Sequence, residues 1–379
     1  MRFEAPKEVK FILSTLENAG YEAFCVGGCV RDILLSITPN DYDITTNALP
    51  NQIKSLFEKT VDTGIKHGTV TVIINTIPFE VTTYRTDGDY LNHRKPENVL
   101  FVSNIKEDLL RRDFTINAIA LSKNGEIVDY FGGAEDIKHK ILRAVGEPRK
   151  RFTEDALRIL RLFRFASRLN FTIEEETLKS ALLLSPTLKN ISRERIANEL
   201  FEILCSNHPH LAKPLFSCGA LAFLGIETAE LTFLTNLEKD KKLRFCAFCL
   251  KNKIDGENLL NELKCDNATK EHFLFVKEIT QKPPKTKCEI KKCLRDFSYA
   301  SLIDSYKILG FNTDEIENVI NSGEPYLISH LKINGDDLVS LGFKGKDIGK
   351  HLNDLCDLVI SKPHLNQKET LLSLLKQNA

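Results

Sequence analysis

The chain has 379 residues, of which 52 are basic, 52 are acidic and 42% are hydrophobic. This length and apolar content predict a globular protein of two or three domains, since a single hydrophobic core rarely extends over so many residues. No run of eighteen apolar residues occurs, and the first twenty residues mix acids and bases in an amphipathic pattern. The sequence therefore argues against a membrane span or a secretory signal and predicts a cytoplasmic protein.

Ten cysteines are scattered along the chain without the regular spacing of a disulfide framework. The C-x-x-C pair Cys246 and Cys249 lies in an apolar pattern of helical period, without a second pair or a histidine at zinc-site spacing. We expect reduced thiols packed in the core rather than a metal site.

The net charge is zero, but one segment has an excess of basic residues. Between residues 111 and 170, basic residues outnumber acidic ones by 13 to 8. A local basic patch matters more than the total charge for binding nucleic acid, so a nucleic-acid partner stays open.

The sequence has two regions with different residue patterns. Up to about residue 145, short β-branched runs such as "EAFCV", "TVTVII" and "FEVTTY" alternate with turns and short helical segments, which indicates a small sheet with helices around it. From residue 151 onward, segments of helical period follow one another. We therefore predict an α+β protein, with a small mixed β-sheet head followed by a long all-helical body and tail.

Residues 21–35 read "YEAFCVGGCVRDILL", a predicted strand that enters a Gly27-Gly28 turn and then a helix. A glycine turn that opens a helix presents backbone N–H groups to a phosphate without a Cβ in the way. Arg31, in the first turn of this helix, can add a charge-assisted contact to the same phosphates. The pattern predicts a phosphate-binding turn, although a Gly-Gly pair alone is common in ordinary loops.

The segment "DYDIT" places Asp41 and Asp43 two residues apart in a predicted strand. Both carboxylates then point to one face and can share a divalent cation. Next to a phosphate-binding turn, such a pair suits Mg²⁺-assisted phosphoryl or nucleotidyl transfer. An ordinary polar loop is the alternative. Glu80 is either a third carboxylate near the metal or a plain surface residue of a strand.

The glycine turn and the two aspartates, in this order, resemble the signature of the polymerase-β nucleotidyltransferase superfamily, and more narrowly of the class II tRNA nucleotidyltransferases and bacterial poly(A) polymerases. Four further blocks resemble the same family at their proper places. They are "LLRRDFTINAIA" (109–120), "DYFGGAEDIKHKILRAVG" (129–146), "EDALRILRLFRFASRL" (154–169) and "SRERIANEL" (192–200). Five ordered blocks over the first 200 residues make this resemblance specific.

The fourth block has a pattern of its own, because polar residues recur every three positions and share one helical face. They are Asp155, Arg158, Arg161 and Arg164. A solvated face is the ordinary explanation, but Asp155 only accepts hydrogen bonds and Arg158 only donates them. Cytosine and adenine each present a ring acceptor beside an exocyclic amino donor, so this pair can admit CTP and ATP and reject UTP and GTP.

The resemblance implies a role for each matched residue. Asp41 and Asp43 are implied to be catalytic and to bind Mg²⁺. The implied nucleotide-binding residues are Gly27, Gly28, Arg31, Arg112, Asp113, Asn117, Asp155, Arg158, Arg161 and Arg164. Within this set, Asp155 and Arg158 are expected to read the base and Arg161 and Arg164 to face the triphosphate. The residues of the second block are expected to contact the nucleotide and hold its ribose.

The implied activity is CCA addition, in which C, C and A are added without a nucleic-acid template to the 3′ end of tRNA from CTP and ATP, with release of pyrophosphate. The implied parts are a catalytic head (1–145), a neck that recognises the base (146–205), a body (206–325) and a tail (326–379). Body and tail are expected to bind the acceptor stem and elbow of tRNA by shape. In the tail, Gly342, Gly345 and Gly349 either hold an RNA phosphate or form a tight connection between helices.

Other members of the family share these blocks. Residues 84–115 resemble the flexible loop with which a CCA-adding enzyme progresses from CTP to ATP, which disfavours a CC-adding enzyme and leaves an A-adding enzyme open. Residues 62–85 match tRNA nucleotidyltransferases better than poly(A) polymerases, although the head would serve both. A catalytically inactive RNA-binding module is disfavoured, because the metal-binding carboxylates and the Arg-Asp pair are both present.

Overall fold

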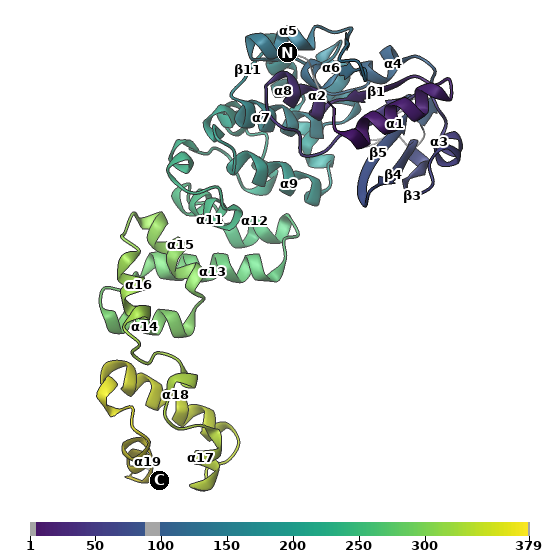
Figure 1. Cartoon of the computed structure of the whole chain (residues 1–379). Helices are drawn as coiled ribbons and strands as arrows, with labels where there is room; N and C mark the ends of the chain where they lie inside the picture. Colours follow the sequence, from purple (N-terminus) through teal and green to yellow (C-terminus); the bar gives the residue numbers. More distant parts are fainter. Residues whose placement is uncertain (1–4, 88–98, 378–379) are drawn as a thin grey trace. The chain divides into compact units, whose positions relative to one another are not determined.

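The computed structural model describes residues 5–87 and 99–377. The chain forms two compact units, Met1–Thr235 and Asn236–Ala379 (Figure 1). The first unit holds the sheet together with helices, and the second is built of helices. The predicted fold class, an α+β protein with a mixed-sheet head followed by helices, is confirmed.

A seven-stranded sheet forms the centre of the first unit, in the order β3-β4-β5-β2-β1-β8-β9. Neighbouring strands are antiparallel except β2 and β5, which are parallel, so the sheet is mixed. Two further pairs are antiparallel β6–β7 and parallel β10–β11. The strands are β1 (Ala23–Val26), β2 (Ile44–Thr46), β3 (Thr60–Gly64), β4 (Thr69–Ile74), β5 (Ile77–Thr83), β6 (Arg85–Asp87), β7 (Val99–Phe101), β8 (Ile119–Leu121), β9 (Ile127–Asp129), β10 (Ile141–Leu142) and β11 (Thr172–Ile173).

Ten α-helices are described in the first unit. They are α1 (Lys7–Asn18), α2 (Gly28–Leu34), α3 (Pro50–Leu56), α4 (Ile105–Leu110), α5 (Gly133–His139), α6 (Pro148–Glu154), α7 (Leu157–Leu169), α8 (Glu175–Leu184), α9 (Arg193–Leu204) and α10 (Lys213–Ser217). Helix α1 shows why the apolar spacing matters. Its residues Val9, Ile12, Leu13 and Leu16 share one face, are buried, and cover β1.

The core beneath the site lies where β1 and β8 meet α4. Val26, Ala120, Leu109 and the aromatic ring of Tyr84 are buried there in one cluster. Strand β1 runs between β2 and β8, so the turn after Val26 starts from the middle of the sheet. Helix α2 and the 3-10 turn η2 (Thr115–Asn117) contact each other beside this turn. The first and second sequence blocks are thereby brought together.

The second unit is described by nine α-helices. They are α11 (Lys241–Lys251), α12 (Gly256–Glu262), α13 (Asn267–Gln281), α14 (Lys287–Asp296), α15 (Tyr299–Leu309), α16 (Asp314–Asn321), α17 (Gly335–Ser340), α18 (Lys346–Ser361) and α19 (Lys368–Gln377). Helices α13 and α15 pack together, and His272 joins them through Asp304 (2.9 Å) and Ser301 (3.0 Å). Gly342 and Gly345, both at positive φ, lie between α17 and α18, as the predicted break between helices requires.

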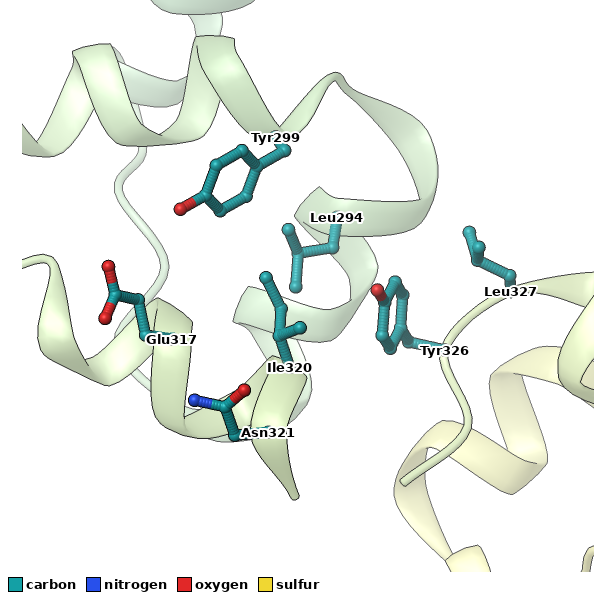
Figure 2. A pocket seen from close by; sticks show the side chains of 7 residues that line it. All are labelled: Leu294, Tyr299, Glu317, Ile320, Asn321, Tyr326 and Leu327. Carbon is teal, nitrogen blue, oxygen red and sulfur yellow. The ribbon is translucent and has the colours of Figure 1, made fainter. Parts of the chain in front are cut away.

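A cavity of about 510 Å³ lies among α14, α15, α16 and the segment that follows them (Figure 2). Tyr299 and Tyr326 line it together with Leu294 and Ile320, and Glu317 contributes the charged group of the lining. It contains none of the residues that the sequence marks as functional, so the candidate site is found elsewhere.

All ten cysteines are free thiols, as expected. Cys246 and Cys249 are buried in α11, where burial raises the pKa of both thiols. Five of the ten cysteines are buried in the core as predicted, whereas Cys218 is exposed and the other four are half-buried. Across the described parts of the chain, no helix is long and apolar enough to cross a membrane.

The packing of α5 against η2 is tested by Gly133→Ala. A Cβ at this position would lie 2.1 Å from the backbone oxygen of Thr115, and the backbone cannot yield cheaply. We expect a loss of about 1–3 kcal/mol in the free energy of unfolding, measured by urea denaturation. The control Gly349→Ala, in α18, meets nothing within 4 Å and should gain roughly 0.5–1 kcal/mol instead. Equal effects of the two changes would contradict the close packing of α5.

Candidate active site

The glycine turn sits at the end of β1. Gly27 has φ 78°, a conformation that side chains with a Cβ rarely adopt, and its N–H donates to Ile119 O (3.2 Å). A Cβ at Gly27 would also come within 3.0 Å of a terminal nitrogen of Arg112. Glycine is therefore needed here for the backbone conformation and for the approach of an arginine. The prediction of a strand, a turn and a helix in succession is confirmed.

Asp41 and Asp43 precede β2 rather than lying in it, so their predicted place in a strand is wrong by three residues and one residue. Regular pairing begins at Ile44, where the buried part of the segment starts and continues through Thr45 and Thr46. The Val26 N–H still donates to Asp43 O (3.0 Å), which holds this segment beside β1. Both aspartates remain exposed.

The pKa of the Asp43 carboxyl is raised above its usual value. Loss of surrounding water is the largest cause; Arg112 lowers the pKa, and the like charges of Asp41 and Glu80 raise it further. A divalent cation would relieve this repulsion, and carboxylate oxygens are the ligands that Mg²⁺ prefers.

Within residues 5–87 and 99–377, His, Cys, Asp and Glu side chains do not gather in threes as a complete protein-made metal site would. Glu80 thus does not join Asp41 and Asp43 in a three-carboxylate cluster. The aspartate pair still fits Mg²⁺, because this ion is typically held by one or two carboxylates, with water and substrate phosphates filling its other positions.

A chain of buried polar groups links the first, second and fourth blocks. Arg31 donates to Asn117 Oδ1 (2.7 Å), and Asn117 Nδ2 donates to Asp113 Oδ1 (3.0 Å). The other Asp113 oxygen accepts two hydrogen bonds from Arg161, at 2.8 and 2.6 Å. Arg31 is also paired with its neighbour Asp32. Residues 130 positions apart in the sequence are therefore fixed to one another.

Glu199 of the fifth block continues this chain to Arg164 of α7. Its carboxylate lies 2.7 Å from Arg164 Nε and 4.0 Å from Arg161. The ring of Phe165 makes cation–π contacts with three arginines of this chain of polar groups. The guanidinium groups of Arg164, Arg161 and Arg31 lie 4.4, 5.3 and 5.3 Å from its centroid. The three arginines of the predicted polar stripe lie on α7, where protein groups engage them, whereas Asp155 lies before the helix.

Asp155 and Arg158 have different neighbours from those the sequence suggests. Asp155 lies between α6 and α7, where its oxygens accept from the Leu157 N–H (3.0 Å) and from Arg195 (2.8 Å). Arg158, on α7, donates to Glu154 (2.8 Å) and to backbone oxygens in α6 and in the second block. Each of the two is held by its own partner of opposite charge.

Four charged residues of this site were missed by sequence reasoning. They are Asp108, Glu154, Arg195 and Glu199. Asp108 precedes Arg112 by four residues, and Glu154 precedes Arg158 by four, a spacing that brings helical side chains together and could have revealed both pairs. Arg195 and Glu199 lie in the fifth block, where no local spacing marks a functional side chain. Their contacts with Asp155 and Arg164 depend on the packing of α9 against α7, which spacing alone does not give.

The predicted flexible loop is described only at its two ends. Strands β6 and β7 pair there in antiparallel fashion, Arg85 opposite Phe101. Residues 88–98 lie outside the described residues.

Comparisons with known proteins find similarity along the whole chain. The model of the "Poly A polymerase head domain" family matches residues 23–143, and that of the "Probable RNA and SrmB- binding site of polymerase A" matches residues 170–229. The CCA-adding enzyme of Ligilactobacillus salivarius is 37% identical over 97% of this chain and 95% of its own length. The CCA-adding enzyme of Lactobacillus helveticus is 51% identical over 205 residues. This match covers 54% of this chain and spans about half the length of that relative.

Among solved structures, the CCA-adding enzyme of Bacillus stearothermophilus in complex with CTP superimposes with a TM-score of 0.86 at 30% identity. The match covers 98% of this chain and 97% of that one. Similarity therefore extends over both compact units and is not confined to the head.

The buried Asp113 makes stability depend on pH. Burial raises its pKa, but Arg161 and the Asn117 hydrogen bond lower it more strongly, to about 2. The unfolded value is about 3.9, so the carboxylate stabilises the fold above that pH and loses this effect as the pH falls toward 2. We expect the free energies of unfolding of the wild type and of Asp113→Asn to converge by about 1 kcal/mol between pH 6 and pH 3. Urea titrations at both pH values measure this, and a constant difference would contradict the shifted pKa.

Proposed function

Because this chain belongs to the family of CCA-adding enzymes, which are nucleotidyltransferases, we propose that it adds C, C and A in turn to the 3′ end of tRNA, using CTP and ATP and releasing pyrophosphate. The observation that supports this most is a single constellation in the first unit. It combines a glycine turn, an aspartate pair and an arginine row, which we define as Arg158, Arg161 and Arg164 of α7.

The triphosphate is assigned to the glycine turn. Gly27 and Gly28 offer backbone without side chains, and Arg112 brings a cation directly against Gly27. The Nε of Arg112 is buried and has no hydrogen-bond partner among the described residues, so it is available to a phosphate oxygen. Arg31, already bonded to Asn117 and Asp32, adds positive charge beside the turn.

Asp41 and Asp43 are assigned as the catalytic carboxylates that hold Mg²⁺. When bound, this ion lowers the pKa of the 3′ hydroxyl of tRNA and neutralises charge that develops at the α-phosphate. The protein's own contribution is to keep two carboxylates close together and to place Arg112 beside Asp43. Their exposure leaves them open to the RNA and the nucleotide.

The base is assigned to Asp155 and Arg158. Arg158 donates to the ring nitrogen, and Asp155 accepts from the exocyclic amino group, a pattern that cytosine and adenine share. Glu154 and Arg195 restrain the two side chains, so reading a base requires little additional ordering of the protein. Uracil and guanine reverse donor and acceptor at this edge and leave both groups unsatisfied.

The remaining polar residues hold the site together. Asp113 and Asn117 are assigned to the ribose and to the geometry of the second block, and Arg161 and Arg164 to the triphosphate side. Because Asp113 fixes Arg161 through two hydrogen bonds, the orientation of this arginine is set before a nucleotide binds.

We assign the tRNA to the helical parts. The proposed division is a head (1–145), a neck (146–205), a body (206–325) and a tail (326–379), with body and tail binding the acceptor stem and elbow by shape. In the tail, Gly342 and Gly345 precede α18, whose first turn carries Lys346. An RNA phosphate fits this connection, and a purely structural role of the glycines is the alternative.

Two related activities use the same head. An A-adding or CC-adding enzyme would stop at a different nucleotide, and a poly(A) polymerase would add ATP repeatedly to many RNAs. The similarity to CCA-adding enzymes over nearly the whole chain favours complete CCA addition. Incorporation of radiolabelled CTP and ATP into tRNA, in the presence of Mg²⁺, tests the proposal.

The metal assignment predicts that Asp41→Ala and Asp43→Ala each lower incorporation by more than about 100-fold, because even the outer partners of metal ligands are worth 10–100-fold. Binding of tRNA, measured by filter retention, should stay within about twofold of the wild type. The control is Asp62→Ala, an exposed aspartate of β3 that pairs with Lys54. Full activity of either site variant would refute the assignment.

The base assignment predicts that Arg158→Ala relaxes the choice of nucleotide. Loss of a specific hydrogen-bonding pair should raise UTP incorporation relative to CTP by about 10-fold or more. Arg168→Ala, an exposed arginine of the same helix, is the control and should keep the wild-type ratio. An unchanged UTP-to-CTP ratio in the Arg158 variant would show that another group reads the base.

A further inference from the structure

A buried carboxylate on α4 lies at the junction of several elements of the site. The side chain of Asp108 is 0% exposed. Its Oδ1 accepts from Arg111 at 3.0 and 2.7 Å and from the Arg85 N–H at 3.3 Å, and its Oδ2 accepts from Arg112 at 3.2 Å. The hydroxyl of Thr45, two residues after Asp43, lies 3.5 Å from the same Oδ2. One side chain thus joins β2, β6, α4 and the second block.

The charge of Asp108 is balanced by two arginines. Burial alone would raise its pKa, but Arg112 and Arg111 lower it more, so the group is ionised at neutral pH. Neutralising the carboxyl would leave two guanidinium groups near the site without their buried counter-charge, which is costly. The ion cluster is therefore a constraint on where both arginines can be.

Arg112 is the first of the two groups that Asp108 holds. Its guanidinium lies against Gly27, where an added Cβ would come within 3.0 Å, and its charge also acts on Asp43. The bond from Asp108 therefore places a cation between the phosphate-binding turn and the catalytic carboxylates.

Arg111 is the second group that Asp108 holds. Its side chain is held by two hydrogen bonds to Asp108, while its backbone oxygen accepts from Arg158 (2.8 Å). A movement of Arg111 would remove a restraint from the arginine assigned to the base. Asp108 consequently acts on both ends of the nucleotide site, directly at Arg112 and through the Arg111 backbone at Arg158.

We propose that Asp108 is a positioning residue for nucleotide selection. It touches no nucleotide. It holds Arg112 for the triphosphate and, through Arg111, holds Arg158 for the base, so that binding and base choice depend on one buried carboxylate. This inference rests on the proposed function, because it takes the site to bind CTP and ATP.

The first test uses Asp108→Asn, which keeps the shape and removes the charge. Dissociation constants for CTP, ATP and UTP are measured by calorimetry with the full chain. We expect CTP and ATP to bind about 10- to 100-fold more weakly, the range for losing a charged hydrogen bond, and the preference for CTP over UTP to shrink. Glu107→Gln, the exposed neighbour on α4, is the control and should match the wild type. Unchanged constants in Asp108→Asn would overturn the proposal.

A double-mutant cycle separates positioning from general loosening of the fold. If Asp108 acts on the triphosphate through Arg112, then Asp108→Asn in an Arg112→Ala background should weaken CTP binding little further. The preference for CTP over UTP should still fall in that background, because the route through Arg111 is intact. If the double variant lost the sum of the two single losses in CTP affinity, the proposal would be contradicted. Melting curves of all variants show whether each one folds.

Arg111→Lys gives a second, milder test that does not depend on the folding of Asp108→Asn. It breaks the paired hydrogen bonds to Asp108 but keeps the Asp108–Arg112 contact and the local charge. We expect a smaller CTP-over-UTP preference with CTP affinity within about threefold of the wild type. An unchanged preference would remove the link to Arg158. Wild-type chain that binds CTP but extends no tRNA would count against the proposed function and leave the Asp108 comparison valid.

Discussion

The site depends on one constraint: cations that bind a nucleotide must stay fixed and charged while no nucleotide is present. Arginine side chains are long and their charges repel one another, so each needs a partner. Asp113 supplies it for Arg161, Glu199 for Arg164, Glu154 for Arg158 and Asp108 for Arg112. These carboxylates come from different segments, and the fold brings each one against its arginine.

This constraint explains features that would otherwise look unrelated. Gly27 lacks a side chain because Arg112 occupies the space next to it. Phe165 is buried among three guanidinium groups, whose attraction to the ring face compensates for some of the hydration they lose. The low pKa of Asp113 has the same origin as the fixed position of Arg161. Asp41 and Asp43, by contrast, are exposed and form no ion pair with a neighbouring side chain among the described residues, which suits an ion that arrives with the substrate.

The sequence predicted the fold class, because apolar periodicity is a local signal, whereas the common role of the five blocks was implied by the family resemblance. It placed Asp41 and Asp43 in a strand that begins only at Ile44, since strand boundaries depend on burial as well as on residue type. It paired Asp155 with Arg158 by helical spacing. The break between α6 and α7 instead gives Asp155 to Arg195 and Arg158 to Glu154. The packing of α9 on α7, which sets the Arg195 contact, is not encoded in any short spacing.

The most direct test of the account is nucleotide addition read at single-nucleotide resolution. Purified protein with Mg²⁺ is given tRNA transcripts that end at the discriminator base, at C and at CC, with CTP, ATP or both. We expect C, C and A to be added to the transcript that ends at the discriminator base, C and A to the C-ended one and A to the CC-ended one, each followed by a stop. Arrest at CC, addition of A to the CC-ended transcript alone, or long A tails on unrelated RNA would each contradict the account.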